Sequence, residues 1–431
     1  MIKETPERGI LTGNVPLTPI QKWFFDKSLV NIHHFNQSIL LEVKEKITLH
    51  MVKAIFNVIA QYHDVFRMRY KLEDKNYVQA YTNDFVIEVE EREISPEKIY
   101  EDTAKIQASL NIFNGPIVKV VLYRSAEEND NLFIVAHHLV IDGVSWRIIM
   151  DDIETIYKQF MDTGRIALPP KTHSYRQWAN SNINYVKSEN GIKEQTYWKE
   201  IEKSIKETFL EPDFNYNVDR NSNYLNISLN KTDTKSLIQE LPKKYDAQIN
   251  DVLLTALTLA VGDISGNYEL SFSLEGHGRE EVMGLDVSRT IGWFTSVFPV
   301  FLKITNFNNL KDSIREIKNF LIKIPNKGIG YGIIKHYTNL LNKPLPKVSF
   351  NYLGQWDSGI SEQGVFQYAK ELSGEDGDIR NHSDNLIDMN GGVKNGIFEM
   401  CFGYNAGVYK KETIERFANC FKEKLLDMIY E

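Results

Sequence analysis

One stretch in the first half of this chain limits the folds open to it more than any other. Residues 132–136 are all apolar and predict a buried strand, and residues 144–150 begin an apolar pattern with helical spacing. Between them stand His137, His138 and a turn at 142–143. A strand, a turn and a helix therefore follow one another here. A histidine at such a junction is either structural or a proton carrier, since its ordinary pKa of about 6.5 lies near cellular pH.

The same alternation of strands and helices runs along the chain and predicts an α/β (α+β) fold. In the segment 48–61, for example, apolar residues recur at the spacing of an amphipathic helix. The other predicted helices are 97–110, 175–188, 191–206, 250–263, 310–324 and 413–429. The other predicted strands are 36–43, 67–70, 78–81, 118–123, 225–229, 268–274, 296–302, 347–353, 386–389 and 396–402.

The length of the chain predicts two lobes. Its 431 residues are too many for one ordinary hydrophobic core. Pro169 and Pro170 interrupt the helical pattern and mark 163–172 as a linker. We therefore expect an N-terminal lobe at 1–172 and a C-terminal lobe at 173–431.

Composition excludes several classes of protein. The net charge is −8 and no block of Lys or Arg is present, so neither nucleic acid nor an anionic membrane is an expected partner. Two cysteines, Cys401 and Cys420, do not make a disulfide framework or a metal site. The start lacks the apolar core of a signal peptide, and no apolar run approaches about 18 residues. We expect a cytoplasmic protein without a membrane span or a bound metal.

Further motifs follow in a fixed order. With HHLVIDG at 137–143 they resemble the epimerization domains of nonribosomal peptide synthetases, from about residue 15 to residue 430. The HHxxxDG core is shared with condensation domains, whereas EGHGRE and the tryptophan after Ser145 are similar to the epimerization branch. The other motifs are PIQKWF at 19–24, NDVLLTA at 250–256, EGHGRE at 275–280, RTIGWFT at 289–295, GIGYG at 328–332 and FNYLG at 350–354.

The resemblance implies a fold and an activity. The fold would be two lobes like chloramphenicol acetyltransferase, each a β-sheet core with flanking helices, in a V-shaped pseudo-dimer with the active site in a tunnel between them. The activity would be L-to-D inversion of an aminoacyl or peptidyl residue held as a thioester on the 4′-phosphopantetheine of a carrier domain. The chain would be a monomeric domain of a larger synthetase. Its partners would be an upstream peptidyl carrier domain and a downstream condensation domain or module.

This reaction sets its own chemical requirements. The thioester carbonyl makes the α-proton acidic, and inversion removes that proton from one face and returns one to the other through a planar enolate. The site needs a base, an acid on the opposite side and a group that stabilises the enolate oxygen. Because the thioester already activates the α-carbon, the chain is expected to bind no cofactor.

The principal site residues follow from the motif positions. His138 matches the base of the family, and His137 should point to the opposite face of the strand and be structural. Glu275 is the candidate for the opposing acid or base, as a partly buried carboxylate with raised proton affinity. If the strand continues, His277 lies on the same face and supports or contacts Glu275.

Other residues are expected to support the site. Asp142 either caps the next helix or pairs with an arginine, and Arg67 resembles the family arginine that braces this loop. We therefore expect an Arg67–Asp142 pair that fixes His138. Gly143 is expected to permit an unusual turn, and Ser145 either binds the carrier arm or caps the helix.

Some residues allow two interpretations of similar weight. Asn351 and Tyr352 either stabilise the enolate oxygen or pack in a strand. Trp293 is expected in the core or the wall of the tunnel. The glycines of 328–332 lack the context of a phosphate-binding loop, which argues against a nucleotide site.

Two other functions stay open. A condensation catalyst would use His138 to assist attack by an amine and would need a second, acceptor carrier. A non-catalytic docking module would only bind carrier proteins. EGHGRE argues against the first, and the intact His138 and Glu275 argue against the second.

Overall fold

The computed structural model describes residues 4–83, 87–125, 129–214, 222–355, 364–381 and 383–431. The chain forms two compact units. Unit 1 comprises Met1–Tyr185, His277–Thr295 and Gly359–Asn381, and unit 2 comprises Val186–Gly276, Ser296–Ser358 and His382–Glu431. Two units were expected, but they are not the continuous lobes 1–172 and 173–431.

The difference from the expected boundary has a physical cause. The helix after the predicted linker is held in unit 1, because Tyr175 Oη contacts Thr18 Oγ1 at 3.0 Å and donates to the Trp293 carbonyl at 2.8 Å. The chain also returns twice to unit 1, at 277–295 and 359–381. The EGHGRE motif is therefore divided between the units after Gly276.

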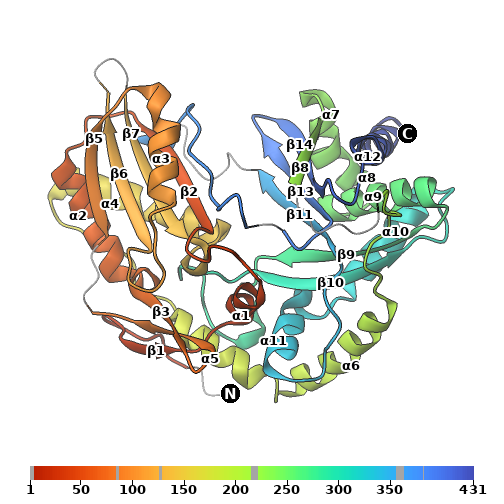
Figure 1. Ribbon diagram of the computed structural model, residues 1–431, viewed down its shortest axis with the longest axis horizontal. Helices are drawn as coiled ribbons and strands as arrows, with labels where there is room; N and C mark the ends of the chain where they lie inside the picture. The colour runs from red at the N-terminus through yellow and green to blue at the C-terminus, as the bar shows by residue number, and fades with distance from the viewer. Residues whose placement is uncertain (1–3, 84–86, 126–128, 215–221, 356–363, 382) are drawn as a thin grey trace. The chain divides into compact units, whose positions relative to one another are not determined.

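The main sheet of unit 1 has five strands in the order β12-β2-β7-β6-β5. Only β5 and β6 are parallel; the other neighbours are antiparallel. The register pairs Asn36 of β2 with His137 of β7, so the start of β2 lies beside the end of β7 (Figure 1). The strands are β2 (Asn36–Val43), β5 (Glu88–Glu93), β6 (Val118–Arg124), β7 (Asp130–His137) and β12 (Phe366–Tyr368).

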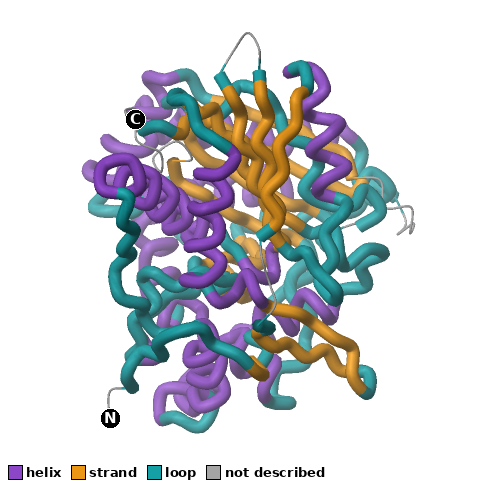
Figure 2. The backbone as a smooth tube through the Cα atoms, turned by 90° about the vertical axis from the view of Figure 1, so that its left-hand side faces the viewer, coloured by secondary structure: helices purple, strands orange, loops and turns teal. Residues whose placement is uncertain are grey.

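Helices cover this sheet. Helix α3 (Ile99–Gln107) packs Ile99 and Ile106 on Val121 and Phe133, whereas α2 (Leu49–Tyr62) packs on α4 (Gly143–Thr163) and β5. Figure 2 shows helices on both sides of these strands. The apolar run that ends at His137 is buried because the strand is covered on both faces.

A smaller sheet and several short turns complete unit 1. The sheet has the order β1-β4-β3. Its strands are β1 (Gly13–Val15), β3 (Met68–Glu73) and β4 (Asn76–Tyr81), and the remaining helices and turns are α1 (Pro19–Asp26), α5 (Tyr175–Tyr185), η1 (Asp64–Arg67), η2 (Pro96–Lys98), η3 (His138–Val140) and η5 (Glu281–Met283).

Unit 2 is built on a six-stranded sheet in the order β10-β9-β11-β13-β14-β8. Strand β11 is parallel to both of its neighbours, and the remaining pairs are antiparallel. The strands are β8 (Ser222–Ser228), β9 (Glu269–Gly276), β10 (Ser296–Lys303), β11 (Val348–Gln355), β13 (Ile387–Lys394) and β14 (Ile397–Asn405).

The core of unit 2 lies between this sheet and its longest helices. Helices α9 and α12 pack on each other and on the sheet, and contribute Leu257, Ala260, Phe417 and Phe421 to the core. The helices are α6 (Glu189–Ser204), α7 (Lys231–Lys235), η4 (Ser236–Glu240), α8 (Leu241–Lys244), α9 (Ile249–Ser265), α10 (Leu310–Ile322), η6 (Pro325–Gly328), α11 (Ile329–Tyr337) and α12 (Lys411–Tyr430).

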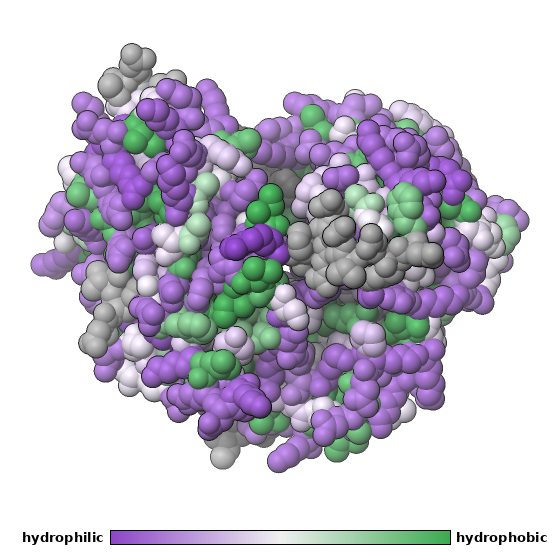
Figure 3. All heavy atoms as spheres, viewed as in Figure 1, coloured by the Kyte–Doolittle hydropathy of each residue, from purple (hydrophilic) through white to green (hydrophobic). Residues whose placement is uncertain are grey.

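The face drawn in Figure 3 is mostly hydrophilic, with smaller hydrophobic patches. Among the described helices none is by itself long and apolar enough to span a bilayer. Taken together, the bent pair Lys231–Lys244 and Ile249–Ser265 has the length and the apolar composition of a span.

Candidate active site

His138 lies directly after β7, at the first residue of the turn η3. Its backbone N–H donates to the Phe35 carbonyl at 2.9 Å, and its ring Nδ1 lies 2.7 Å from the Ile141 carbonyl oxygen. Because a carbonyl only accepts, Nδ1 carries the proton and Nε2 keeps the lone pair. The Trp293 ring stacks on the imidazole with centroids 4.2 Å apart. The turn and the stacking fix the position of the ring.

The surroundings of His138 favour its neutral form. Burial lowers the pKa of the His138 imidazole, and the hydrogen bond to Ile141 and the charge of Asp142 oppose this only in part. The ring is therefore neutral near pH 7 and carries its lone pair on Nε2. This is the protonation state that a general base requires.

His137 has a structural role, as its strand position predicted. Its Nε2 donates to the Ile32 carbonyl at 2.9 Å, and its Nδ1 accepts from the Leu139 backbone N–H at 3.2 Å. Burial lowers the pKa of His137 to about 3, so the ring stays neutral. No group of three His, Cys, Asp or Glu side chains within the described ranges could hold a metal ion.

Asp142 both caps α4 and pairs with an arginine. Its Oδ1 accepts from the Ser145 backbone N–H and from Ser145 Oγ, both at 2.7 Å. Ser145 Oγ also accepts from the Gly292 backbone N–H at 3.1 Å, so the cap is tied to the segment 289–295. Gly143 begins the helix without a positive φ, and a side chain there would meet open space. The prediction that Gly143 permits an unusual turn is therefore wrong.

The arginine that pairs with Asp142 is Arg279. Its Nη2 donates to both carboxylate oxygens, at 3.1 and 3.3 Å, and to Ser145 Oγ at 2.9 Å. Arg67 instead binds Asp64 and the carbonyls of Ala60 and Leu11. The prediction of an Arg67–Asp142 pair is wrong, because Arg67 lies at the end of η1 and forms its ion pair with Asp64 there.

The segment 289–295 completes the surroundings of His138 within unit 1. The Phe294 backbone N–H donates to Asp142 Oδ2 at 3.1 Å, and the Arg279 guanidinium lies 3.9 Å from the Phe294 ring centroid. Only glycine fits at position 292, since a β-carbon there would lie 2.4 Å from the Tyr175 ring. This close approach places Trp293 against the imidazole. Trp293 is thus core-like, as expected, and also a direct neighbour of His138.

Glu275 belongs to unit 2 and lies one residue before the end of β9. Its carboxylate accepts a hydrogen bond from Asn351 Nδ2, with 3.1 Å between Nδ2 and Oε2. The parallel register of Phe350 with Leu274 brings these two side chains together. Glu275 is exposed, which differs from the partly buried carboxylate that was expected. Asn351 is therefore a neighbour of a candidate catalytic group, and its contact with the enolate oxygen stays a prediction.

Tyr352 and His277 are placed differently from Asn351. Tyr352 packs near Phe398 in the core of unit 2, and burial raises the pKa of its phenol, which favours the packing role. His277 follows the end of β9, so it does not continue the strand face as expected. Its Nε2 lies 3.1 Å from Glu280 and its Nδ1 accepts from the Arg279 backbone N–H at 3.0 Å.

One neighbour of His138, Gln37, was not found from the sequence. Gln37 Nε2 lies 3.1 Å from His138 Nε2, and Trp146 Nε1 donates to Gln37 Oε1 at 2.9 Å. The tryptophan belongs to a recognised motif, but its partner lies on β2, and only the register of β2 with β7 connects them. Nothing in the sequence around Gln37 indicates this contact.

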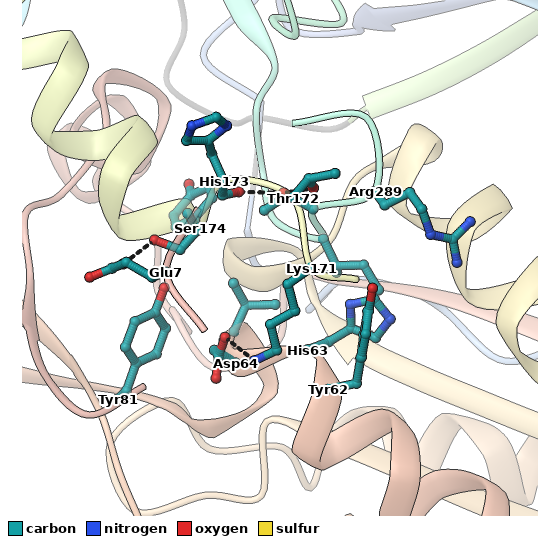
Figure 4. Close-up of a pocket in the computed structure, with 14 residues that line it drawn as sticks. Glu7, Tyr62, His63, Asp64, Tyr81, Lys171, Thr172, His173, Ser174 and Arg289 are labelled. Carbon is teal, nitrogen blue, oxygen red and sulfur yellow. Dashed lines mark hydrogen bonds and ion pairs between the residues drawn. The ribbon is translucent and has the colours of Figure 1, made fainter. Parts of the chain in front are cut away.

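A separate small cavity lies in unit 1 (Figure 4). Its volume is about 30 Å³, which is room for about two water molecules. Lys171 binds Asp64 at 2.7 Å in its wall, and Ser174 donates to Glu7 at 2.5 Å. None of the residues predicted for the site lines it. The cavity is a polar packing feature of unit 1.

Comparison with known proteins places these features in a family. The family model for the condensation domain matches residues 12–431. The chain belongs to the condensation-domain family. It is 34% identical over 455 residues to gramicidin S synthase 1 of Brevibacillus brevis, which covers 99% of this chain and 41% of that protein. It is 38% identical over 437 residues to bacitracin synthase 3 of Bacillus licheniformis, which covers 97% of this chain and 7% of that protein.

Solved structures extend this comparison to the fold. The crystal structure of the epimerization domain from the third module of tyrocidine synthetase B matches with a TM-score of 0.89 and 33% identity, and the match covers 99% of this chain and 98% of that one. The SgcC5 protein from Streptomyces globisporus shares the fold, with a TM-score of 0.76 at 14% identity over 96% of this chain and 98% of that one. The chain therefore has the mixed α/β architecture of this family. It spans less than half the length of each of the two synthases.

Proposed function

We propose that this condensation-family domain inverts the α-carbon of an aminoacyl or peptidyl residue, from L to D, while the residue is held as a thioester on the 4′-phosphopantetheine of a carrier domain. The observation that carries the proposal is the state of His138. Its ring is neutral, is anchored through Nδ1–H to the Ile141 carbonyl and keeps a lone pair on Nε2. Similarity to an epimerization domain at 33% identity over 98% of that structure supports the same reaction.

The proposed chemistry needs two proton carriers. His138 Nε2 takes a proton from the α-carbon, so that the C–H bond breaks, an N–H bond forms and the electron pair moves to the thioester oxygen as an enolate. Return of a proton to the other face re-forms the carbonyl with inverted configuration. Glu275, held by Asn351, is the proposed second carrier. The reaction is reversible, and each group is restored by exchange with water.

The partners of the domain are part of the proposal. The substrate handle belongs to an upstream peptidyl carrier domain, and the product passes to a downstream condensation domain or module. Sequence relatives that are much longer synthases support such neighbours. Tethering gives the substrate a high effective concentration, so its intrinsic affinity can be weak. We also propose that the domain acts as a monomer in the cytoplasm.

A second candidate function is condensation. The family model that matches residues 12–431 describes condensation domains, and a neutral imidazole can also assist the attack of an amine on a thioester. In that reaction the amine of an acceptor-bound residue attacks the donor thioester carbonyl, a peptide bond forms and the donor carrier thiol leaves. Such a catalyst needs two loaded carriers, whereas an epimerase needs one.

Deuterium incorporation separates the two functions. An L-aminoacyl carrier protein is incubated with the chain in deuterated water, and the released amino acid is resolved into enantiomers and weighed. We expect D-product with one deuterium, its loss in H138A and E275Q, and unchanged formation in H50A, a change at an exposed histidine of α2. Absence of both inversion and exchange, with dipeptide formed once an acceptor carrier is added, would establish condensation instead.

A further inference from the structure

Two side chains from different elements of unit 1, Gln37 and Trp146, form a chain of hydrogen bonds that ends at the unprotonated nitrogen of His138. Gln37 is the second residue of β2 and pairs with Ala136 of β7, which brings its amide to the imidazole. The distance between Gln37 Nε2 and His138 Nε2 is 3.1 Å. Trp146, in the first turn of α4, donates from Nε1 to Gln37 Oε1 at 2.9 Å. All three side chains are partly buried.

The chemistry of these groups fixes the direction of each hydrogen bond. An indole N–H is only a donor, so the group of Gln37 that faces Trp146 must be its carbonyl oxygen. The amide NH₂ therefore faces His138 and donates to Nε2. The Ile141 carbonyl, on the other side of the ring, accepts from Nδ1 at 2.7 Å. Two independent contacts thus select the same tautomer.

We infer that Gln37 is a positioning residue for His138, and that Trp146 fixes the Gln37 amide so that its NH₂ faces Nε2. In this arrangement the Nε2 lone pair accepts the hydrogen bond from the Gln37 amide, which holds the ring in one orientation until substrate displaces the amide. The kinetic part of this inference rests on the proposed function, but the orientation of the ring and its tautomer do not.

The arrangement also acts on the protonated ring. An imidazolium carries N–H at both nitrogens, so its Nε2–H would meet the Gln37 NH₂, donor against donor. The amide cannot turn its oxygen to the ring without breaking its bond to Trp146. Other titratable or charged groups beside the ring are His137 and Asp142, with Arg279 paired to Asp142. The Gln37–Trp146 pair therefore opposes lasting protonation of His138 and favours return of the proton.

Two substitutions test the orientation directly. In W146F the indole donor is lost, and the amide is free to present its oxygen to Nε2–H. Q37E places a carboxylate where the Gln37 amide lies, beside His138 Nε2. We expect the pKa of His138 to rise by about 0.5 units in W146F and by about 1 to 3 units in Q37E, as an opposite charge at contact distance produces. W198F is the matched control, because it removes an indole donor to Glu194 in unit 2.

The measurement is nuclear magnetic resonance of the full chain with ¹⁵N-labelled histidine. Long-range coupling reports the tautomer of His138, and titration reports its pKa, both without substrate; near-ultraviolet circular dichroism confirms that each variant is folded. The Nδ1–H tautomer in the wild type, with the pKa raised in both variants and unchanged in W198F, would support the inference. An Nε2–H tautomer, or a pKa unchanged in both variants, would overturn it.

Kinetics give a second readout that separates this inference from the proposed function. With an epimerizable carrier substrate, Q37L should lower kcat about tenfold and leave KM unchanged, as loss of orientation of a base does. An inactive wild type with the expected tautomer and pKa shifts would contradict the epimerase proposal and leave the positioning of the ring supported. An active wild type whose kcat is the same in Q37L would contradict the positioning role alone.

Discussion

The Arg279 guanidinium donates to both carboxylate oxygens of Asp142, at 3.1 and 3.3 Å, although the two residues lie 137 positions apart in the sequence. Each side chain is only 6% exposed. The pair ties the segment after β9 to the first turn of α4, four residues after His138. Asp142 acts at the same time as the helix cap, so one carboxylate holds both the helix start and the arginine.

Breaking this pair should be costly for stability. R279Q leaves Asp142 buried without its partner, and we expect the free energy of unfolding to fall by about 3–5 kcal/mol. In a double-mutant cycle, R279Q and D142N should couple by about 0.5–3 kcal/mol. R67Q and D142N should instead be additive to within about 0.5 kcal/mol, because Arg67 binds Asp64. Chemical denaturation of the single and double variants measures both couplings, and coupling between Arg67 and Asp142 would contradict the assignment.

Local periodicity predicted most elements of the fold. The strands at 36–43 and 132–137 and the helix from 144 are confirmed because each contains its own pattern of buried positions. Strand β12 was missed, since three residues carry too little pattern and its partner β2 lies more than 300 positions earlier. Strand β5 was missed because its sequence, EVEERE, is largely charged and half exposed at the edge of the sheet.

The site was predictable where one segment carries the chemistry, and not where distant segments meet. The structural role of His137 and the capping by Asp142 follow from the strand, turn and helix that contain them. The choice between Arg67 and Arg279 does not, because both are buried arginines in motif-like sequences and only their positions in space differ. The contact of Gln37 with His138 likewise depends on the register of β2.

Asn351 should affect the rate through Glu275. Its Nδ2 donates to the Glu275 carboxylate at 3.1 Å, so N351A removes this hydrogen bond and should lower kcat for inversion about 10- to 100-fold, as misplacement of a reacting group does. The control is N226A, at an exposed asparagine on the edge strand β8 of the same sheet. Chiral analysis of the released amino acid measures both rates. Equal rates for N351A and the wild type would show that Glu275 needs no such partner.

The pH dependence of the reaction should report the lowered pKa of His138. Burial favours the neutral ring, and a general base acts in its neutral form, so activity should rise with pH through that pKa and level off by about pH 7. We expect the acid limb of kcat/KM for α-deuterium exchange to have its midpoint below the ordinary value of about 6.5. A midpoint above that value would contradict a neutral resting ring. Carrier protein titrated separately controls for effects on the substrate.

Stability, by contrast, should depend on pH through His137. Its folded pKa of about 3 lies below the unfolded value of about 6.5, so the unfolded chain binds more protons between these limits and stability falls as pH falls through this window. From pH 8 to pH 5 the titration of His137 alone should lower the free energy of unfolding by about 2 kcal/mol.

The variant H137N tests this pH dependence, because it keeps an acceptor near Leu139 N–H and removes the titration. It should be less stable at pH 8 because its bond to Ile32 is lost, yet lose about 2 kcal/mol less than the wild type on going to pH 5. Chemical denaturation at both pH values, with H50N as the control at an exposed histidine, measures this difference, and parallel losses in H137N and the wild type would show that His137 is not the group that titrates.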